Sequence, residues 1–308
     1  MNHLLVAEKV SKSYGDFKAL NEVSLNVPHG SIYGLLGPNG AGKTSLIRII
    51  NQITMPDTGT VTLDNQPLNP QHVKDIGYLP EERGLYKSMK VGEQALYLAQ
   101  LKGMSKSEAK SKLKYWFDKF EITNWWHKKI QELSKGQAQK IQFIVTVLHQ
   151  PKLLIFDEPF SGFDPINANL IKDEILKLRA TGTTIIFSTH RMESVEELCD
   201  HIALIHQSNK ILDGKLNDIK RNFKTNVFEV GLRTSDESNL ISQLKLHFKI
   251  LPASFKNLND DLKLNIKIGH QQTSNDLLSV LTNYAQVNHF VEVIPTVNDI
   301  FIETVNRN

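Results

Sequence analysis

The fold of this chain is decided by the stretch Gly37-Pro38-Asn39-Gly40-Ala41-Gly42-Lys43-Thr44, which matches the phosphate-binding pattern G-x-x-x-x-G-K-[ST]. An apolar run, Ser31–Leu36, precedes the stretch and is typical of a buried strand. Residues Thr44–Ile50 follow it with helix-forming and apolar side chains. Because strand, glycine-rich turn and helix are the context that this motif requires, the sequence predicts an α/β fold with a P-loop and a nucleoside triphosphate ligand.

The chemistry expected of the loop follows from its residue types. Glycines let backbone N–H groups turn toward phosphate oxygens, and the positive end of the following helix adds to the attraction. Lys43 is expected to contact the β- and γ-phosphates, and the Thr44 hydroxyl is expected to be a ligand of Mg²⁺.

A second candidate site is the run Lys152–Glu158, an apolar strand that ends in two acids, in the pattern called Walker B. Asp157 at the strand end is expected to hold Mg²⁺, directly or through water. Glu158 is placed to polarise an attacking water. The alternative is a buried strand followed by two loop acids without a catalytic role.

Composition bounds the class of protein. The 308 residues, with 40% hydrophobic and 22% charged side chains, fit an ordinary soluble globular protein of about two domains. A net charge of +3 is too small to argue for a nucleic-acid partner. The single cysteine, Cys199, excludes an internal disulfide and suits a buried apolar position. No apolar run approaches the length of a membrane span, and the N-terminus lacks a signal-peptide pattern, so we expect a cytoplasmic protein.

Between these two sites lies Leu133-Ser134-Lys135-Gly136-Gln137, which resembles the signature L-S-G-G-Q of the ATP-binding cassette (ABC) family. Ser134 and Gln137 also form the pattern of a capping box, which any helix start can use. Tyr14 resembles the aromatic residue that stacks on adenine in this family, although a lone tyrosine is more often a surface turn residue. The resemblance covers about residues 3–222.

Two further motifs occur in the order of the family. The run Ser161–Pro165, with Asp164, resembles the D-loop, and its alternative reading is a turn before a helix. His190 resembles the switch histidine that follows the last core strand, here Thr184–Phe187. Its alternative reading is a neutral, hydrogen-bonded surface histidine.

The resemblance implies a set of functional residues. Catalysis is assigned to Glu158, His190 and Lys43, and the metal ligands to Thr44, Asp157 and Glu81. The residues implied to bind ATP are Tyr14, Gly37, Pro38, Asn39, Gly40, Ala41, Gly42, Lys43, Thr44 and Ser45. The signature residues implied to meet the ATP of a second copy are Ser134, Lys135, Gly136 and Gln137. The chain therefore resembles half of a catalytic unit, which is completed by a homodimer or a related cassette.

The sequence departs from the family at two positions. After the run Asp75–Pro80, Glu81 stands where the family has the glutamine of its Q-loop, and a register one residue later would place Glu82 there. A carboxylate at that place can still ligate Mg²⁺ or orient water, but it adds negative charge near phosphates. Lys135 replaces the first glycine of the signature. It can favour the γ-phosphate or point to solvent, and we favour solvent.

The sequence predicts two domains. Residues 1–222 are interpreted as an ABC nucleotide-binding domain, an α/β P-loop fold with an N-terminal antiparallel β region and a helical subdomain at about residues 85–150. Residues 223–308 show the order βαββαβ, with a helix that Ser274 is able to cap, which indicates a small α+β ferredoxin-like domain. Asn298–Ile302 adds one helical turn. Residues 226–308 hold seven basic and nine acidic residues, a net charge of −2, unlike a nucleic-acid platform.

The functional hypothesis is an ATPase subunit of an ABC transporter that works with a separate multi-spanning permease at the inner face of the cell membrane. The C-terminal domain resembles the extension of ATP-binding subunits in bacterial exporters of the sodium-efflux type, which favours export. One alternative is a soluble ABC ATPase acting on nucleic acid or ribosomes. Another is a regulatory module that binds ATP without hydrolysing it, against which the presence of Glu158 and His190 argues.

Overall fold

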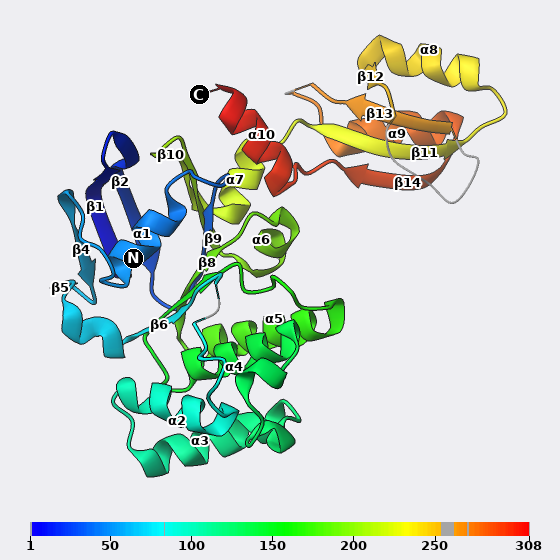
Figure 1. Cartoon of the computed structure of the whole chain (residues 1–308). Coiled ribbons are helices and arrows are strands. Elements are labelled where there is room, and N and C mark those ends of the chain that lie inside the picture. Colours follow the sequence, from blue (N-terminus) through cyan, green and yellow to red (C-terminus); the bar gives the residue numbers. More distant parts are fainter. Residues whose placement is uncertain (1, 83, 254–261, 270, 308) are drawn as a thin grey trace. The chain divides into compact units, whose positions relative to one another are not determined.

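The computed structural model describes residues 2–82, 84–253, 262–269 and 271–307. They form two compact units, one of Met1–Leu216 with Phe301–Asn308 and one of Asn217–Ile300. Figure 1 shows the order of the elements along the chain. The C-terminal helix α10 (Val297–Arg307) is longer than the single turn predicted for Asn298–Ile302, and it crosses the boundary between the two units.

A six-stranded sheet forms the centre of the first unit. In spatial order it contains β10 (Asn209–Lys215), β9 (His201–His206), β3 (Ile32–Leu36), β8 (Thr184–Ser188), β7 (Leu153–Asp157) and β6 (Ile76–Leu79). The strands from β9 to β6 are parallel, and β10 is antiparallel to β9. Every residue of β3, β7 and β8 is buried, as expected of parallel strands that are covered on both faces.

The parallel order brings the functional motifs together. The P-loop follows β3, the two acids of the Walker B run end β7, and His190 follows β8. Because β8 lies between β3 and β7, the three motifs meet at one edge of the sheet. One prediction about this sheet is wrong: Thr184–Phe187 is not the last core strand, since β9 follows it in the chain and pairs in parallel with β3.

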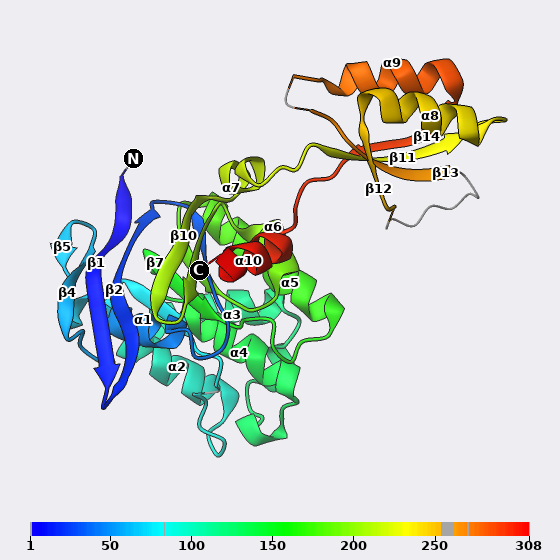
Figure 2. The same cartoon turned by 90° about the horizontal axis from the view of Figure 1, so that it is seen from above.

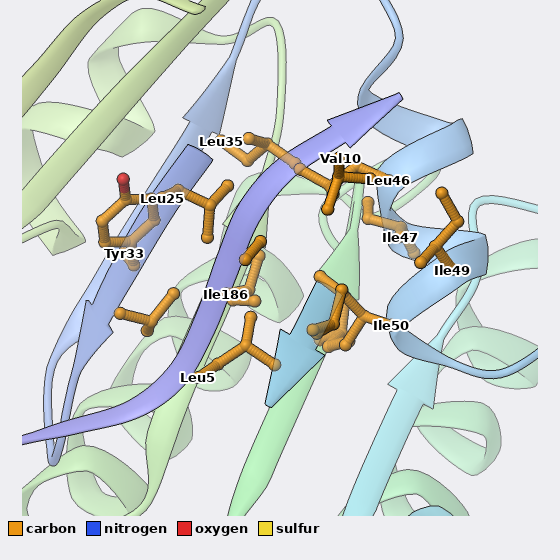
Figure 3. Close-up of a cluster of buried hydrophobic side chains, with 14 of the residues drawn as sticks. Leu5, Val10, Leu25, Tyr33, Leu35, Leu46, Ile47, Ile49, Ile50 and Ile186 are labelled. Atoms are coloured by element: carbon orange, nitrogen blue, oxygen red, sulfur yellow. The ribbon is translucent and has the colours of Figure 1, made fainter. Parts of the chain in front are cut away.

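A smaller antiparallel sheet and helix α1 (Lys43–Ile50) anchor the P-loop. The sheet contains β2 (Phe17–Pro28), β1 (His3–Tyr14), β4 (Thr58–Leu63) and β5 (Gln66–Pro67). Figure 3 shows the buried face of α1 in a cluster with side chains of β1, β2, β3 and β8. Leu46, Ile47, Ile49 and Ile50 are each at most 1% exposed. Burial of such a side chain stabilises by about 1.5–3 kcal/mol, so the helix that begins in the loop is firmly held.

The remaining helices of the first unit follow the sheet strands or form a helical region between β6 and β7. They are α2 (Val91–Leu101), α3 (Lys106–Lys119), α4 (Lys135–Val147), α5 (Pro165–Ala180) and α6 (Met192–Leu198), with short 3₁₀ turns η1 (Pro70–Lys74), η2 (Thr123–Trp125) and η3 (Ile130–Glu132). Helix α7 (Leu216–Asn222) begins at Leu216, and its remaining residues belong to the second unit. Figure 1 shows α2 and α3 side by side. The helical region has a partly aromatic core, which includes the buried side chains of Leu113, Trp116, Phe117 and Phe120.

The second unit has the predicted βαββαβ order. It contains β11 (Val227–Arg233), α8 (Glu237–His247), β12 (Lys249–Leu251), β13 (Leu262–Lys267), α9 (Ser274–Tyr284) and β14 (Gln286–Glu292). Its antiparallel sheet has the order β12-β13-β11-β14, and Figure 2 shows α8 and α9 on one face of it. The predicted helix cap is off by one residue, because the Thr273 hydroxyl, not Ser274, accepts the hydrogen bond from the backbone of Asp276.

Candidate nucleotide site

The P-loop is shaped by glycines that no other residue can replace without movement. Gly37 and Gly42 have positive φ angles of 147° and 116°. A Cβ at Gly37 would lie 2.1 Å from the carbonyl oxygen of Ile205, and one at Gly42 would lie 2.3 Å from that of Ala19. The loop is therefore pressed against the backbone of β9 and β2, and Gly42 begins α1 from a left-handed conformation.

Lys43 folds back over its own loop. Its ammonium donates hydrogen bonds to the carbonyl oxygens of Gly37, at 2.7 Å, and Pro38, at 3.1 Å. Burial lowers the pKa of this lysine, and the nearby carboxylates of Asp157, Glu158 and Glu81 oppose the shift. The lysine is thus a cation at the edge of three acids, held by neutral carbonyls that a phosphate oxygen can replace.

The Walker B acids lie at the end of β7. Asp157 is buried, and this burial raises the pKa of its carboxyl group, with the neighbouring carboxylates of Glu158 and Glu81 adding to the shift and Lys43 opposing it. Such a concentration of carboxylates around one ammonium favours the addition of a further cation.

Glu158 is fixed by three donors from the segment that follows β8. Its Oε2 accepts a hydrogen bond from the Thr189 hydroxyl at 3.1 Å, and its Oε1 accepts one from the backbone N–H of His190 at 2.8 Å. The Nδ1 atom of His190 lies 2.7 Å from the same Oε1. Glu158 has a positive φ of 51°, and its own N–H donates to the carbonyl of Ser188. No motif in the sequence predicts the Thr189 contact, which depends on the pairing of β7 with β8.

These groups surround a cavity of about 180 Å³. The loop and the start of α1 contribute Asn39, Gly40, Gly42, Lys43, Thr44 and Ser45 to its wall. The other lining residues are Phe17, Ala19, Glu81, Asp157, Glu158 and His190. The structure therefore brings together most of the residues predicted for catalysis, phosphate contact and metal binding, and Glu81 is among them.

The aromatic residue at this cavity is Phe17, which sequence reasoning missed. Its side chain is 58% exposed, and it pairs with Tyr14 at the tip of the β1–β2 hairpin. Tyr14 does not line the cavity, and the ammonium of Lys12 lies 5.7 Å from the centre of its ring. The only signal in the sequence is the position of Phe17, three residues after Tyr14 across a Gly-Asp turn.

The signature residues do not line this cavity either. Ser134 caps α4, and its hydroxyl and the Gln137 side chain form the predicted capping box. Asp164 caps α5 by accepting from the backbone N–H of Asn167. Gly37, Pro38 and Ala41 shape the loop without lining the cavity. The chain thus carries a phosphate pocket and a separate helix start of the kind that binds anions.

The cavity also offers oxygen atoms of the kind that a metal ion binds. No group of three or more His, Cys, Asp or Glu side chains is arranged to hold a metal within the described part of the chain. The Thr44 hydroxyl and the Asp157 carboxylate line the cavity beside the place for phosphates. These residues fit Mg²⁺, which proteins usually hold through one or two groups together with phosphate oxygens.

The fold and the cavity define a P-loop ATPase. Residues 20–161 match a family model described as ABC transporter, and residues 214–305 match one described as ATP-binding protein DrrA1-3-like, C-terminal domain. A shorter match, over residues 127–196, is to a model described as AAA domain, putative AbiEii toxin, Type IV TA system.

Individual proteins match over most of the chain. The Bacillus subtilis protein called uncharacterized ABC transporter ATP-binding protein YhaQ is 43% identical over 98% of both chains. The Nod factor export ATP-binding protein I of Cupriavidus pinatubonensis is 33% identical over 70% of this chain and 67% of its own length. A solved structure, the ATP-binding subunit of an ABC transporter, is 29% identical and covers 71% of this chain and 93% of its own, with a TM-score of 0.67.

The chain therefore belongs to the family of ABC transporter ATP-binding proteins, and its cassette is an ATPase domain that binds ATP. The predicted fold class and family are both confirmed. Nothing in these matches supports the alternative that the protein acts on nucleic acid or ribosomes. Within the described residues, no helix is both long and apolar enough to cross a membrane.

Proposed function

We propose that this chain hydrolyses ATP as one of two cassettes docked on a membrane-spanning permease, and that the assembly exports its cargo. The observation that carries the proposal is the position of Glu158, held by Thr189 and His190 at the wall of the P-loop cavity. A carboxylate with fixed oxygens beside a phosphate pocket is suited to orient a water molecule for attack.

Each catalytic residue of the cavity is assigned a distinct role in ATP hydrolysis. Water attacks the γ-phosphorus in line, the bond from this phosphorus to the bridging oxygen breaks, and ADP and phosphate are the products. Glu158 orients the water and takes up its proton, while Lys43 and the loop N–H groups stabilise the charge on the phosphate oxygens. His190 holds Glu158 on one side and faces the γ-phosphate on the other.

A metal ion completes this charge balance. The residues that would hold Mg²⁺ are Thr44 and Asp157, with Glu81 as a further carboxylate at the cavity. When bound there, Mg²⁺ would supply positive charge that offsets the negative charge of the phosphate oxygens. Glu81 then serves either as a ligand or as a group that orients water.

A second cassette supplies what this cavity lacks. Ser134 and Gly136 stand at the start of α4, away from the cavity that the same chain forms. In the proposed pair, each helix start faces the γ-phosphate held by the P-loop of the other cassette. Two such contacts related by a two-fold axis close the assembly without further copies, in a homodimer or with a related chain.

A groove in the first unit is proposed to receive the permease. It has a volume of about 390 Å³ and is lined mainly by apolar side chains of β6, α2, α4 and the turn that follows α1. Ile53 and Leu101 at this groove are each 61% exposed, so the groove continues onto apolar surface that a partner can cover. Gly84 and Leu85, three and four residues after Glu81, line the same groove, so a bound permease segment is linked to the nucleotide cavity through one short loop.

The proposed direction of transport, export, is based on the relatives of this chain. The Nod factor export ATP-binding protein I carries this activity in its name. The match of residues 214–305 to a C-terminal domain model of ATP-binding proteins supports the division into a nucleotide-binding domain, 1–222, and an accessory domain, 223–308. We place the chain at the cytoplasmic face of the membrane, where the permease would hold it.

The catalytic part is tested with Glu158→Gln, which keeps the hydrogen-bond acceptor but removes the base. We expect ATP hydrolysis to fall by at least a hundredfold while ATP binding stays intact, and ATP to trap a dimer that size-exclusion chromatography separates from the monomer. Glu82→Gln, beside Glu81, is the matched control and should keep most of the activity. Equal hydrolysis rates in wild type and Glu158→Gln would remove Glu158 from the mechanism.

The docking part is tested with Leu101→Asp in cells that express the chain with the product of a neighbouring permease gene. The variant should lose co-purification with the permease from detergent-solubilised membranes but keep ATP affinity. Ile166→Asp, at an exposed residue of α5 outside the groove, is the control. Full recovery of the permease with Leu101→Asp would assign its docking to another surface.

A further inference from the structure

Lys135 occupies the place at which the family signature has its first glycine. It is the first residue of α4, directly after the capping residue Ser134. A cation in the first turn of a helix is disfavoured by the helix dipole, so this residue is not there to stabilise α4. It has no ion-pair partner within the described part of the chain.

The side chain of Lys135 runs across the D-loop. A Cβ at Gly162 would lie 2.6 Å from Cε, 2.8 Å from Cδ and 3.1 Å from Cγ of Lys135. The aliphatic part of the lysine thus fills the space above Gly162, which has a φ of 87°. A glycine in the signature has no side chain with which to make this contact.

Two neighbouring contacts extend the same seam between α4 and the segment 159–163. A Cβ at Gly136 would lie 3.5 Å from the carbonyl oxygen of Gly162 and 3.7 Å from the ring of Phe163. The buried Gln139 amide donates to the carbonyl of Pro159 at 3.5 Å. The segment is also joined to the backbone of the proposed catalytic residue, because the N–H of Ser161 donates to the backbone carbonyl of Glu158 at 3.0 Å.

We propose that Lys135 is a positioning residue whose aliphatic stem clamps the D-loop to the start of the signature helix, so that the two segments move as one. This inference rests on the proposed pairing of cassettes, in which α4 faces the ATP of the second copy. The clamp joins that helix start to the loop that begins at Glu158. Each cassette thereby links the ATP of the second copy, which its α4 contacts, to the ATP in its own P-loop cavity, which Glu158 helps to hydrolyse.

The aliphatic stem of Lys135, not its charge, makes the contact with Gly162. Two variants separate the effect of the stem from the effect of the charge. Lys135→Met keeps an aliphatic chain of similar length without the charge, while Lys135→Gly restores the signature glycine and removes the stem. The first measurement is backbone hydrogen exchange over residues 160–164 in the full-length, nucleotide-free protein. We expect at least threefold faster exchange in Lys135→Gly and a wild-type rate in Lys135→Met. A wild-type rate in Lys135→Gly, or equally fast exchange in both variants, would overturn the clamp.

Gly162→Ala provides the reciprocal change. Its methyl group takes the space of the Lys135 stem and also strains the backbone at a φ of 87°, so it should accelerate exchange in the wild-type background and do so less when combined with Lys135→Gly. Additive effects of the two substitutions would show that the residues act independently and would contradict the clamp.

The second measurement uses the Glu158→Gln background, in which ATP traps the dimer. The ATP concentration for half-maximal dimer formation should rise at least threefold with Lys135→Gly and stay unchanged with Lys135→Met. An equal rise with both variants would assign Lys135 to a phosphate contact through its charge and would overturn the positioning role. The exchange experiment needs neither ATP nor a dimer, so a failure of the proposed function leaves its result standing.

Discussion

The Nδ1 atom of His190 lies 2.7 Å from Oε1 of Glu158, and the backbone N–H of His190 donates to the same oxygen at 2.8 Å. Both contacts come from the segment after β8, whereas Glu158 ends β7. The pairing of these two strands therefore fixes the direction of the carboxylate before any nucleotide binds. A group that is already oriented loses little entropy in the reaction, so in the proposed mechanism His190 contributes by orienting Glu158 and does not act as the base.

Replacement of His190 should uncouple binding from hydrolysis. His190→Ala removes the Nδ1 contact and the group proposed to face the γ-phosphate, so we expect kcat to fall by about a hundredfold with ATP affinity changed by less than threefold. Thr189→Val removes only the weaker contact, at 3.1 Å, and should cost less. Steady-state ATPase assays and nucleotide titrations check both variants. An ATP affinity that falls as far as kcat would make His190 a binding residue instead.

Phe17 is expected to contribute to the affinity for ATP, because it is the exposed aromatic side chain that lines the P-loop cavity. Stacking of a base on an aromatic ring is worth about 1–3 kcal/mol, so Phe17→Ala should weaken ATP binding by about tenfold. Phe17→Trp keeps an aromatic ring and should retain the wild-type affinity. Tyr14→Ala, measured beside it by fluorescence titration with a labelled nucleotide, tests the family resemblance. Unchanged affinity in Phe17→Ala with a loss in Tyr14→Ala would assign the base to Tyr14 alone.

Acid should weaken the fold through His149. Burial lowers the pKa of its imidazole from 6.5 to about 4, Lys102 adds to the shift, and Nε2 lies 3.3 Å from the carbonyl oxygen of Ile76. The unfolded chain thus binds the proton first as the pH falls below 6.5. Stability that is complete above this pH decreases by about 1.4 kcal/mol per pH unit toward pH 4.

The measurement is the free energy of unfolding in urea at pH 7.5 and pH 5.0. By pH 5.0 the loss due to His149 should reach about 2 kcal/mol in the wild type and be absent in His149→Gln, which stays neutral. His127→Gln, at an exposed histidine, is the matched control and should follow the wild type. If His149→Gln loses as much stability as the wild type, the imidazole is not responsible.

The sequence predicts the parts of the site that are written as contiguous motifs. The P-loop, the end of β7 and the segment after β8 are each short, and the parallel order of their strands brings Lys43, Asp157 and His190 to one edge of the sheet. The order of elements in the second unit follows in the same way from alternating and helical periodicities.

Contacts between segments that are far apart in sequence could not be predicted. Phe17 reaches the cavity because the β1–β2 hairpin packs beside α1, and no local pattern states this. The stem of Lys135 meets Gly162 only because α4 starts beside the D-loop. From the sequence, the side chain of Lys135 is expected to point either to solvent or to a phosphate. In the structure it packs against Gly162 instead. The positions of such side chains depend on tertiary packing, which cannot be predicted from the spacing of motifs.

The three glycines of the P-loop should differ in their tolerance of alanine. All three have positive φ, but their surroundings are unlike: a Cβ at Gly37 would lie 2.1 Å from a carbonyl oxygen of β9, whereas nothing lies within 4 Å of one at Gly40. Gly40→Ala therefore carries backbone strain of about 1–2 kcal/mol and little else. Gly37→Ala adds a clash with rigid backbone, so its total cost should be about 3 kcal/mol or more.

Thermal unfolding and ATP titration distinguish these cases. Gly37→Ala should lower Tm clearly more than Gly40→Ala and should abolish measurable ATP binding, because the loop must leave β9 to admit the methyl group. Gly42→Ala should behave like Gly37→Ala, since its Cβ would meet the carbonyl of Ala19 at 2.3 Å. If Gly40→Ala proves as damaging as Gly37→Ala, positive φ alone would account for these glycines. The close approach of the loop to β9 and β2 would then have no part in shaping the site.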